Sequence, residues 1–431
     1  MENEIKNKIL QKKAVVSVIG LGYIGLPIAL AFAKAKFKVN GIDIDQKKIN
    51  HLNLKQSYIS DINDADLKNT ISNYHLTFSD KFDSITNSDV IIICVPTPLN
   101  KTKDPDISFI VEVVEQISKF SMNNKIICLE STVYPGATEE IILPRILKTS
   151  NLTVGKDFNI IFSPERIDPG QEHWKLENTP KVIGGITEKC ANLGELLYKT
   201  ICNEIVKVSS TRAAEMTKLL ENTFRAANIG LINEMAVICE KLNLDIWEII
   251  EAAKTKPYGY MPFYPGPGLG GHCIPVDPRY LEWKLETLNI ESKFIKLSEE
   301  VNFSMPNHVV NKAKEIIKNK KLINSIFILG ASYKPNVSDT RESPAIDIMQ
   351  LLEEQDIDFK FNDPLVDIVK INGKEYKSEP LNKINPNSLV IIITDHSNYD
   401  WHELTNQSKY IFDTRNALRN IKNTNVNIFK L

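Results

Sequence analysis

A short run of the sequence, residues 263–277, holds side chains that could do covalent chemistry. Its four glycines and its prolines disfavour a helix or a central strand and favour a loop whose N–H groups can surround a phosphate. Cys273 stands near the end of this loop, with Asp277 four residues on. Dipoles and nearby cations can convert such a thiol into a thiolate, so we expect Cys273 to be a nucleophile. His272 is adjacent, but neighbouring side chains diverge, so we expect it to be structural or to contact a cofactor.

The other five cysteines indicate a reducing compartment. They occur singly, several of them within apolar runs, and no CxxC or Cys/His ligand spacing is present. Buried, inert thiols in a cytoplasmic protein without a metal site are therefore expected. The first thirteen residues are rich in Lys, Glu and Asn, unlike a signal peptide. The five cysteines other than Cys273 are Cys94, Cys128, Cys190, Cys202 and Cys239.

The first third of the chain has the pattern of a dinucleotide-binding fold. An apolar, β-branched run at 15–19 leads into Gly20-Leu-Gly-Tyr-Ile-Gly25 and then into a helical pattern. In such a motif the first glycine permits a tight turn, the second lets the backbone approach a pyrophosphate, and the third allows close helix packing. The N–H groups that begin the helix also attract phosphate. The expected pyrophosphate-binding residues are Gly20, Gly22, Tyr23, Ile24 and Gly25.

Asp43 favours one dinucleotide over the other. It ends the second predicted strand, 38–42, about twenty residues after the glycine motif. A carboxylate at this place accepts hydrogen bonds from a ribose 2′-hydroxyl and repels a 2′-phosphate. The flanking Ile44 and Asp45 supply no arginine for NADP. The sequence therefore predicts NAD as the cofactor.

Three further predicted strands, 89–94, 125–129 and 159–162, end in polar residues. The carboxyl ends of parallel strands meet at one edge of a sheet, where such folds bind ligands. Any one of these segments could be a plain turn, but three segments that bring polar residues to the same edge of the sheet favour a binding site. The residues that follow the strands are Val95, Pro96 and Thr97, then Ser131 and Thr132, then Glu165 and Arg166.

The remaining two thirds contain a long helix and a second α/β unit. Apolar periodicity predicts helix from Thr211 to about Lys256, and Lys218 and Asn222 share one face of it. From the spacing alone, we expect that face of the helix to be exposed to solvent. Strands at 325–329, 358–361, 389–394 and 409–413, with a helix from about Ser343, form the second unit. We expect an α/β protein with two Rossmann-like doubly wound parallel-sheet domains joined by a long central helix.

The expected domains are an NAD-binding domain at 1–205, a central helical region with the Cys273 loop at 206–310, and a C-terminal domain at 311–431. Segment 14–33 is apolar over about the length of a membrane span. Its glycines and proline make a buried strand, turn and helix the better interpretation. The net charge of −2 gives no basic field, so neither nucleic acid nor a membrane is expected as a partner.

These motifs together resemble the UDP-glucose/GDP-mannose dehydrogenase family over nearly the whole length. The Cys273 loop and segment 163–170 are most similar to the bacterial UDP-N-acetylglucosamine 6-dehydrogenases of surface-polysaccharide pathways. The motifs, in the family's order, are Gly20-x-Gly-x-x-Gly25, Val95-Pro-Thr97, Glu130-Ser-Thr132, Ser163-Pro-Glu165, Lys218-x-x-x-Asn222, the Cys273 loop and Lys334-x-x-x-x-Asp-Thr-Arg341.

The resemblance implies a four-electron oxidation of a UDP-sugar at C6 with two NAD⁺. Cys273 would form a thiohemiacetal and then a thioester, which water hydrolyses. Lys218 and Asn222 would stabilise the oxyanion, in contrast to the solvated face inferred from spacing. Asp277 and Thr132 would assist proton transfer through water. The resemblance also implies a homodimer or higher homo-oligomer, formed through the central helix.

The binding residues follow from the same resemblance. Glu165 would be the acid or base of hydrolysis and would touch the substrate, Lys334 would contact the nucleotide sugar, and Arg341 would contact the NAD pyrophosphate. The implied cofactor contacts are Gly20, Gly22, Tyr23, Ile24, Gly25, Asp43, Val95, Pro96, Thr97, Ser131, Thr132 and Arg341. The implied substrate contacts are Glu165, Arg166, Lys218, Asn222, Tyr264, Gly268, Gly270, Lys334 and Arg415.

Two departures from the family's pattern bear on the substrate. Enzymes for UDP-glucose commonly carry a second Glu where this chain has Pro169, and they use an Arg shortly before the glycine-rich loop, where 256–262 has none. Both departures count against UDP-glucose and leave room for a 2-acetamido group, while UDP-N-acetylmannosamine and UDP-glucose stay open as alternatives to UDP-N-acetylglucosamine. The sequence also leaves open a two-electron dehydrogenase of the 6-phosphogluconate or hydroxyacid type, and an NAD-sensing or scaffold protein.

Overall fold

A computed structural model describes residues 2–59, 62–100, 102–167, 173–271, 273–421 and 425–431. The chain forms two compact units. The first unit comprises Met1–Glu221 and Arg279–Asn289, and the second comprises Asn222–Pro278 and Ile290–Leu431. The three domain boundaries expected from the sequence stay a prediction.

The first unit is built around an eight-stranded sheet in the order β3-β2-β1-β4-β5-β6-β7-β8. Its first six strands have the order of a dinucleotide-binding fold, with the reversal between β1 and β4. Neighbouring strands are parallel except for the antiparallel pair β6–β7. The strands are β1 (Val15–Ile19), β2 (Lys38–Ile42), β3 (Leu76–Ser79), β4 (Val90–Ile93), β5 (Ile126–Leu129), β6 (Asn159–Phe162), β7 (Lys181–Gly185) and β8 (Ile205–Lys207).

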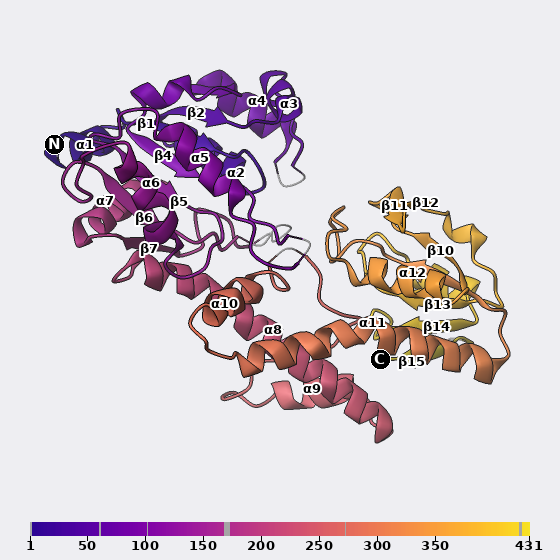
Figure 1. Cartoon of the computed structure of the whole chain (residues 1–431). Coiled ribbons are helices and arrows are strands. Elements are labelled where there is room, and N and C mark those ends of the chain that lie inside the picture. Colours follow the sequence, from indigo (N-terminus) through magenta and orange to yellow (C-terminus); the bar gives the residue numbers. More distant parts are fainter. Residues whose placement is uncertain (1, 60–61, 101, 168–172, 272, 422–424) are drawn as a thin grey trace. The chain divides into compact units, whose positions relative to one another are not determined.

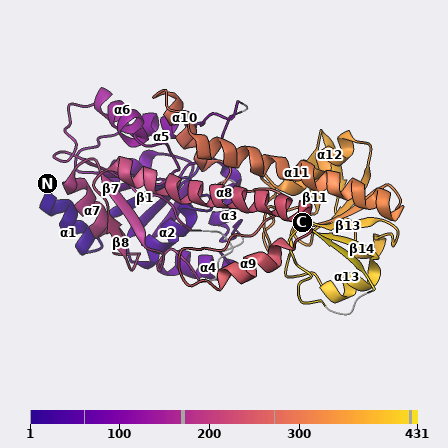
Figure 2. The ribbon, with the colours of Figure 1, turned by 90° about the horizontal axis from the view of Figure 1, so that it is seen from below.

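Helices cover both faces of this sheet. Apolar side chains of α2 and α7 share a buried core with one face of the strands, and Ile5 and Ile9 of α1 join it. Figure 2 shows α5 and α6 on the opposite face. The helices are α1 (Glu2–Leu10), α2 (Gly25–Lys34), α3 (Gln46–Asn53), α4 (Asp64–Asn73), the 3₁₀ turn η1 (Asp83–Asn87), α5 (Ser108–Ile117), the π turn η2 (Thr138–Ile142), α6 (Leu143–Lys148) and α7 (Glu188–Tyr198). The apolar segment 14–33 is therefore β1, a turn and α2, as expected.

The long helix from Thr211 is shorter than predicted. α8 runs from Thr211 to Lys241, and a separate helix, α9 (Ile246–Lys254), follows. Asn243 has a left-handed φ of 56°, a conformation that ends helices. The Asp245 carboxylate then accepts the Trp247 N–H at 2.9 Å and caps α9. The expectation of one uninterrupted helix to about Lys256 was wrong, because these two local signals outweigh the apolar periodicity.

The second unit contains an all-parallel five-stranded sheet in the order β10-β9-β13-β14-β15. This order is the other common doubly wound arrangement, with its reversal between β9 and β13. Side chains of α11 and α12 cover one face, and residues around α13 cover the other. The elements are α10 (Asp277–Glu286, which begins in this unit), α11 (Lys293–Lys320), β9 (Ser325–Leu329), α12 (Pro344–Glu354), β10 (Asp358–Asn362), β11 (Ile368–Ile371), β12 (Lys374–Lys377), η3 (Leu381–Lys383), β13 (Leu389–Ile392), α13 (Trp401–Gln407), β14 (Tyr410–Asp413) and β15 (Asn427–Lys430).

Candidate active site

The glycine motif lies where β1 and β4 meet at the carboxyl edge of the first sheet. Gly20 has a φ of 89°, and a side chain there would approach the Cys94 carbonyl oxygen to 2.6 Å. A Cβ at Gly25 would overlap the Gly20 carbonyl. A Cβ at Gly22, by contrast, would meet no atom within 4 Å. The space beside Gly22 suits a pyrophosphate that approaches the backbone, at the amino end of α2.

Asp43 follows β2 at the same edge and has only 6% of its surface exposed. Its carboxylate accepts hydrogen bonds from Leu21 N at 2.8 Å and Asp45 N at 2.9 Å, so it also fixes the start of the glycine loop. Lys48 Nζ lies 2.9 Å from Asp43 Oδ2, a partner that the sequence pattern did not indicate. The loop, the open space at Gly22 and the buried carboxylate fit NAD.

The loops after β4 and β5 lie beside this site in the first unit. Ser131 Oγ donates to the Val95 carbonyl at 2.7 Å, and Tyr280 OH donates to the Thr97 carbonyl at 3.0 Å. Lys218 Nζ, from α8, donates to Thr132 Oγ1 at 2.6 Å. Lys218 is buried, so the interpretation of its helix face as solvated, based on spacing alone, was wrong.

Glu165 follows β6 and is also buried. Its Oε1 accepts the N–H groups of Arg166 at 2.7 Å and Ile167 at 2.6 Å, and its Oε2 lies 3.2 Å from Lys181 Nζ. Burial alone would raise the pKa of this carboxyl. The Lys181 ammonium, the Ile167 N–H and the Lys218 ammonium outweigh burial and lower the pKa below its usual value. Glu165 is thus held as a carboxylate.

Arg166 is engaged by neighbours in the same unit. Its Nη2 lies 2.7 Å from Glu221 Oε1, and its Nη1 donates to the Pro180 carbonyl at 2.7 Å. These contacts give it a structural role, and its contact with substrate stays a prediction. Positions 168–172, including Pro169, lie outside the described residues, as does His272.

In the second unit, Cys273 is the cysteine that differs from the others. The chain's other five cysteines are buried, whereas Cys273 is partly exposed. Burial raises the thiol pKa of Cys94, Cys128 and Cys202, which makes them unreactive. The Cys273 carbonyl accepts the Asp277 N–H at 2.8 Å, so the turn that holds the thiol leads directly into α10.

Asp277 and Asn222 form a buried pair next to this turn. Asn222 Nδ2 donates to Asp277 Oδ2 at 2.6 Å, and both residues are buried. Lys218 and Asn222 lie four residues apart on α8 and therefore share its face. Both ends of the Lys218-x-x-x-Asn222 motif are therefore held by hydrogen bonds of buried side chains, Lys218 to Thr132 and Asn222 to Asp277.

The glycines of the Cys273 loop pack against the second sheet. A side chain at Gly266 would collide with the Arg415 guanidinium, and one at Gly270 or Gly271 would come within 2.8 Å of Tyr333. Gly271 N donates to the Arg341 carbonyl at 3.2 Å, so this N–H is already used within the protein. The expected loop is confirmed. Its glycines have a packing reason besides any contact with phosphate.

Tyr264 and Gly268 also have neighbours within the second unit. Tyr264 OH donates to Glu251 Oε1 at 2.7 Å, and its ring stacks on Trp247 with centroids 6.1 Å apart. Gly268 has a φ of 140°, and a Cβ there would lie 3.3 Å from Pro344. The substrate contacts expected from Tyr264, Gly268 and Gly270 stay predictions.

Lys334 and Arg415 lie on loops at the carboxyl edge of the second sheet. Lys334 follows β9, next to the reversal between β9 and β13 where such sheets bind ligands. Arg415 follows β14, and its Nε donates to the Ile393 carbonyl at 2.8 Å. Arg341 is paired with Asp339, with Nη2 and Oδ2 2.5 Å apart. The edge therefore carries Lys334 and Arg415, two cations that suit a nucleotide diphosphate.

A buried histidine holds the Lys334 loop in place. His396, after β13, is fully buried, and its Nδ1 accepts the Asn336 N–H at 3.0 Å. The ring proton must then lie on Nε2, which is 3.0 Å from Asp363 Oδ2. Asp363 also accepts the Ala331 N–H at 2.7 Å. Sequence reasoning missed this network, for which an isolated Asp395-His396 pair after a buried strand was the only available signal.

Three stretches of the chain match the UDP-glucose/GDP-mannose dehydrogenase family. They are its NAD binding domain at residues 14–202, its central domain at 212–304 and its UDP binding domain at 327–420. The chain belongs to this family. It is accordingly an NAD-dependent UDP-sugar dehydrogenase, an oxidoreductase, with NAD as cofactor and a UDP-sugar as substrate.

Individual family members with different named substrates resemble the chain. A UDP-N-acetyl-D-glucosamine 6-dehydrogenase of Pseudomonas aeruginosa is 37% identical over 359 residues, 82% of this chain and 84% of that protein. A UDP-N-acetyl-D-mannosamine dehydrogenase of Methanocaldococcus jannaschii is 34% identical over 418 residues, 94% and 92% of the two chains. The solved structure of a UDP-N-acetylmannosamine dehydrogenase from Pyrococcus horikoshii superposes with a TM-score of 0.87 at 30% identity, over 96% of this chain and 98% of that one.

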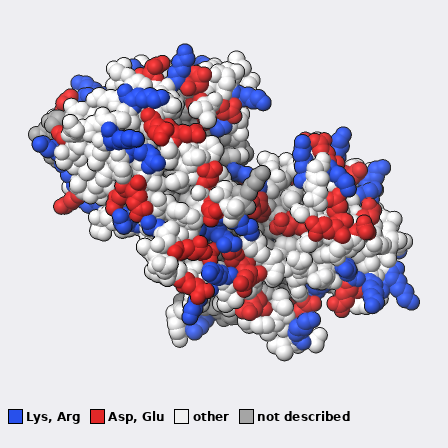
Figure 3. All heavy atoms as spheres, viewed as in Figure 1, with Lys and Arg blue, Asp and Glu red and all other residues white. Residues whose placement is uncertain are grey.

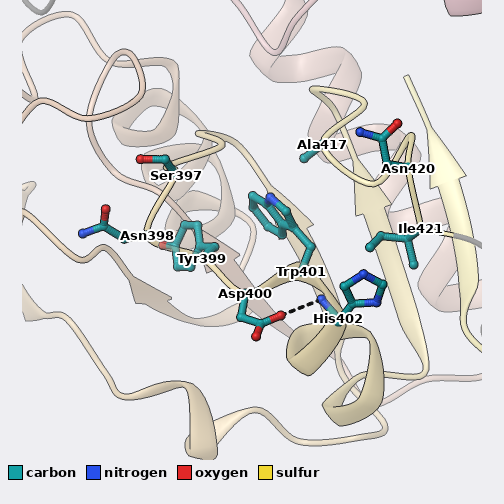
Figure 4. Close-up of a pocket in the computed structure, with 9 residues that line it drawn as sticks. All are labelled: Ser397, Asn398, Tyr399, Asp400, Trp401, His402, Ala417, Asn420 and Ile421. Atoms are coloured by element: carbon teal, nitrogen blue, oxygen red, sulfur yellow. Dashed lines mark hydrogen bonds between the residues drawn. The ribbon is translucent and has the colours of Figure 1, made fainter.

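A pocket of about 520 Å³ lies in the second unit of this UDP-sugar dehydrogenase (Figure 4). It lies among the loops after β13 and β14, with Tyr399 and Trp401 in its lining. The Asp400 carboxylate in its wall caps α13 by accepting the His402 N–H at 2.9 Å. No Lys or Arg is among its nine described lining residues.

Neither sign of charge dominates the face of this family member that Figure 3 shows. On the face shown in Figure 3, basic and acidic side chains are interspersed in each unit, consistent with the net charge of −2. Across the described ranges no three His, Cys, Asp or Glu side chains are arranged to hold a metal ion. In the same ranges, no helix has both the length and the apolarity that crossing a bilayer requires.

Proposed function

We propose that the protein oxidises the C6 hydroxyl of a UDP-linked 2-acetamido hexose to a carboxylate, with UDP-N-acetyl-D-glucosamine as the first candidate substrate. The observation that carries this proposal is Cys273, a partly exposed thiol in a turn that leads into the buried Asp277–Asn222 pair. A dehydrogenase that stops at the aldehyde has no use for such a thiol, whereas one that goes on to the acid can form a thioester on it.

Binding of the substrate would use the two sheets differently. Lys334 and Arg415, at the edge of the second sheet, would hold the UDP group, because cationic side chains complement its diphosphate. The first sheet would hold NAD, which accepts the C6 hydrogen with its electron pair in each of the two oxidations. The NAD pyrophosphate contact expected of Arg341 belongs to the same proposal.

The reacting carbon would be placed at the Cys273 thiol. Lys218 and Asn222 would stabilise the alkoxide and the tetrahedral oxyanions by charge and by an N–H donor. Asp277, with Thr132 acting through water, would assist removal of the hydroxyl proton. The second oxidation would leave the sugar as a thioester of Cys273, and Glu165 would take a proton from the water that hydrolyses it.

The acetamido group is supported by relatives with two different sugars. Relatives named for UDP-N-acetylglucosamine reach 37% identity, and others named for UDP-N-acetylmannosamine reach 34% over more of the chain. The two sugars share the C2 acetamido group and differ only in the configuration at C2. UDP-N-acetylmannosamine is therefore the second candidate, and a role in surface-polysaccharide synthesis accompanies either one.

A substrate panel tests the proposal. The purified protein is incubated with NAD⁺ and each of UDP-N-acetylglucosamine, UDP-N-acetylmannosamine and UDP-glucose, and NADH is counted per sugar consumed. We expect two NADH per sugar, a uronic acid product and the highest kcat/KM with UDP-N-acetylglucosamine. One NADH per sugar would contradict the four-electron course. A preference for UDP-glucose would contradict the acetamido assignment.

A further inference from the structure

A buried chain of polar groups runs behind Glu165 in the first unit. Lys181, the first residue of β7, has 3% of its surface exposed, and its Nζ lies 2.6 Å from Glu130 Oε2 and 3.2 Å from Glu165 Oε2. Glu130 is fully buried, and its other oxygen accepts the Tyr198 hydroxyl from α7. One ammonium group is thus shared by two carboxyl groups at the carboxyl edge of β5 and β6.

The geometry fixes Glu165 at both of its oxygens. Oε1 already accepts two backbone N–H groups, from Arg166 and Ile167, which fills its two lone-pair directions. Oε2 accepts one hydrogen bond, from the Lys181 ammonium. Within the described residues, the second lone pair of Oε2 makes no hydrogen bond. Lys181 therefore fixes the orientation of the Glu165 carboxylate at Oε2. The second lone pair of that oxygen is where Glu165 can accept a proton.

The two carboxyl groups are in different electrostatic states. Burial raises the pKa of Glu130, although Lys181 opposes this effect. For Glu165, the attraction of Lys181, the Ile167 N–H and Lys218 outweighs burial, and the pKa falls. Lys181 itself is held as a cation, because Glu130 and Glu165 together overcome the effect of burial on its pKa. Glu165 is thus the carboxyl of the pair that is more firmly ionised.

Resting on the function proposed above, we propose that Lys181, anchored by Glu130 and Tyr198, is a positioning residue that orients Glu165 and keeps it negatively charged for hydrolysis of the Cys273 thioester. In that step the water oxygen bonds to the thioester carbon, and one of its protons moves to Glu165 Oε2. The carbon–sulfur bond breaks with its electron pair passing to Cys273 Sγ. Nothing is oxidised or reduced, and the sugar leaves as the carboxylic acid.

Several charged or titratable groups face Glu165 and must be considered together. Removing Lys181 takes away the positive charge in contact with Glu165, and removing Glu130 takes away a negative charge that interacts with Glu165. The two changes therefore move the pKa of Glu165 in opposite directions, whereas damage to packing would lower activity in both without such a pattern. The groups from the surrounding elements are Lys181 on β7, Glu130 after β5, Lys218 on α8, Tyr198 and Cys202 at and after the end of α7, and Cys94 after β4.

The test compares pH profiles of kcat for Lys181→Met, Lys181→Arg and Glu130→Gln. We expect Lys181→Met to move the acidic limb up by about one pH unit or more, since an opposite charge at this distance shifts a pKa by 1–3 units. Glu130→Gln should move the acidic limb to lower pH. Lys181→Arg, which keeps the positive charge, should have its acidic limb at the wild-type pH. The KM values for UDP-sugar and NAD⁺ should change by less than about threefold, because Lys181 acts through Glu165.

A rapid-mixing measurement isolates the step. Both oxidations precede thioester hydrolysis, so Lys181→Met should give a burst of two NADH per site followed by a slow phase, with an acyl group on Cys273 detectable by mass spectrometry. If Lys181→Met does not fold, Lys181→Arg and Glu130→Gln still carry the test. A fall in kcat without any movement of the limb in Glu130→Gln, or the absence of a burst in a folded Lys181→Met, would overturn the proposal.

Lys125 provides the matched control. It is another buried lysine of the same unit, but it precedes β5 and donates to the backbone carbonyls of Ile85, at 2.9 Å, and Ser88. Lys125→Met should lower thermal stability and leave the pH profile in place. An equal shift of the limb in Lys125→Met would also overturn the proposal. Failure of the proposed function is distinct from all of these outcomes, because the wild type would then produce no NADH with any UDP-sugar.

Discussion

The side-chain amide of Asn222 donates a 2.6 Å hydrogen bond from Nδ2 to Oδ2 of Asp277. Because Asp277 as a carboxylate only accepts hydrogen bonds, this contact fixes which end of the Asn222 amide is nitrogen. The second N–H of the amide makes no further hydrogen bond within the described residues, and it is the donor that we propose for an oxyanion on the substrate. The pair thus connects the proposed oxyanion donor with the proposed proton acceptor.

Replacing Asn222 should reduce turnover more than binding. We expect Asn222→Ala to lower kcat by about 10²–10³, the usual effect of losing one oxyanion donor, with a small change in KM. Asn222→Asp places a second carboxyl group beside Asp277, so it should bind a shared proton as the pH falls. Its kcat relative to Asn222→Ala should rise between pH 8 and pH 5. Steady-state kinetics across this range would show a constant ratio if the pair has no such role.

Cys273 should be needed to form the uronic acid product but not for the protein to fold. In Cys273→Ala we expect no uronic acid and at most one NADH per sugar, because the thioester cannot form. Cys239→Ala, in the core beside α9, is the matched control and should keep activity within about twofold. Product analysis by mass spectrometry gives the answer. Uronic acid formation by Cys273→Ala would remove the thioester from the mechanism.

Two glycines of the same motif should behave differently when changed to alanine. At Gly22 the added Cβ meets open space, so Gly22→Ala should melt within about 2 °C of the wild type while the KM for NAD⁺ rises about tenfold or more. At Gly25 the Cβ overlaps the Gly20 carbonyl, so Gly25→Ala should lower the melting temperature by at least about 4 °C. Thermal melts and NAD⁺ titrations measure both. Equal effects of the two changes would count against the assigned pyrophosphate position.

Removal of the His396 imidazole should weaken binding of one substrate only. His396→Ala leaves the Asn336 N–H and the Asp363 carboxylate without their shared partner, and each unmade buried hydrogen bond costs about 1–3 kcal/mol. We expect the KM for the UDP-sugar to rise about tenfold and the KM for NAD⁺ to stay unchanged. His402→Ala, on the exposed start of α13, is the control. A parallel rise in both KM values would indicate general damage instead.

Glu215 should make stability depend on pH. Its buried carboxyl accepts Gly136 N at 2.5 Å and Thr138 Oγ1 at 2.6 Å, and burial raises its pKa to about 7. A raised pKa in the folded state contributes stability that is complete below the unfolded pKa of about 4.5 and is lost as the pH rises through 7. The loss amounts to up to about 3 kcal/mol at 1.4 kcal/mol per unit.

The comparison of wild type with Glu215→Gln isolates this effect, because glutamine does not titrate. Melting temperatures are measured from pH 5 to pH 8.5. We expect the wild type to lose stability relative to Glu215→Gln as the pH rises, most steeply between the unfolded pKa of about 4.5 and the folded pKa of about 7, with the loss nearly complete above pH 8. Two parallel curves would show that Glu215 keeps the same protonation state throughout.

The parts of the site that the sequence revealed are those with a local signature. Gly20, Gly22 and Gly25 are required by the turn that they themselves form, and the Cys273 loop is recognisable because glycine and proline exclude regular structure. The burial of Lys218 was not readable from helical spacing, because burial depends on which element packs against that face. The break after Lys241 has local signals in Asn243 and Asp245, but the prediction gave more weight to the apolar periodicity around them.

Residues that act through distant partners were invisible in the sequence. Lys181 meets Glu130 across 51 positions, and His396 meets Asp363 across 33. Lys181 looks like an ordinary polar residue before an apolar run, and His396 like one after such a run. A charged residue that opens a fully buried strand, as Lys181 does before Val182, is the one clue that could have been used, because a lone buried charge is too costly to occur without a partner.

The packing of Gly266, Gly270 and Gly271 against Arg415 and Tyr333 has a consequence for how this protein can recombine. The Cys273 loop fits the particular side chains of the C-terminal sheet, so we expect the two to be inherited together. A chimaera that takes its C-terminal domain from a relative should function only when its crossover falls before residue 263, so that the loop and the C-terminal sheet come from the same parent. Natural exchange of sugar specificity within the family would follow the same seam.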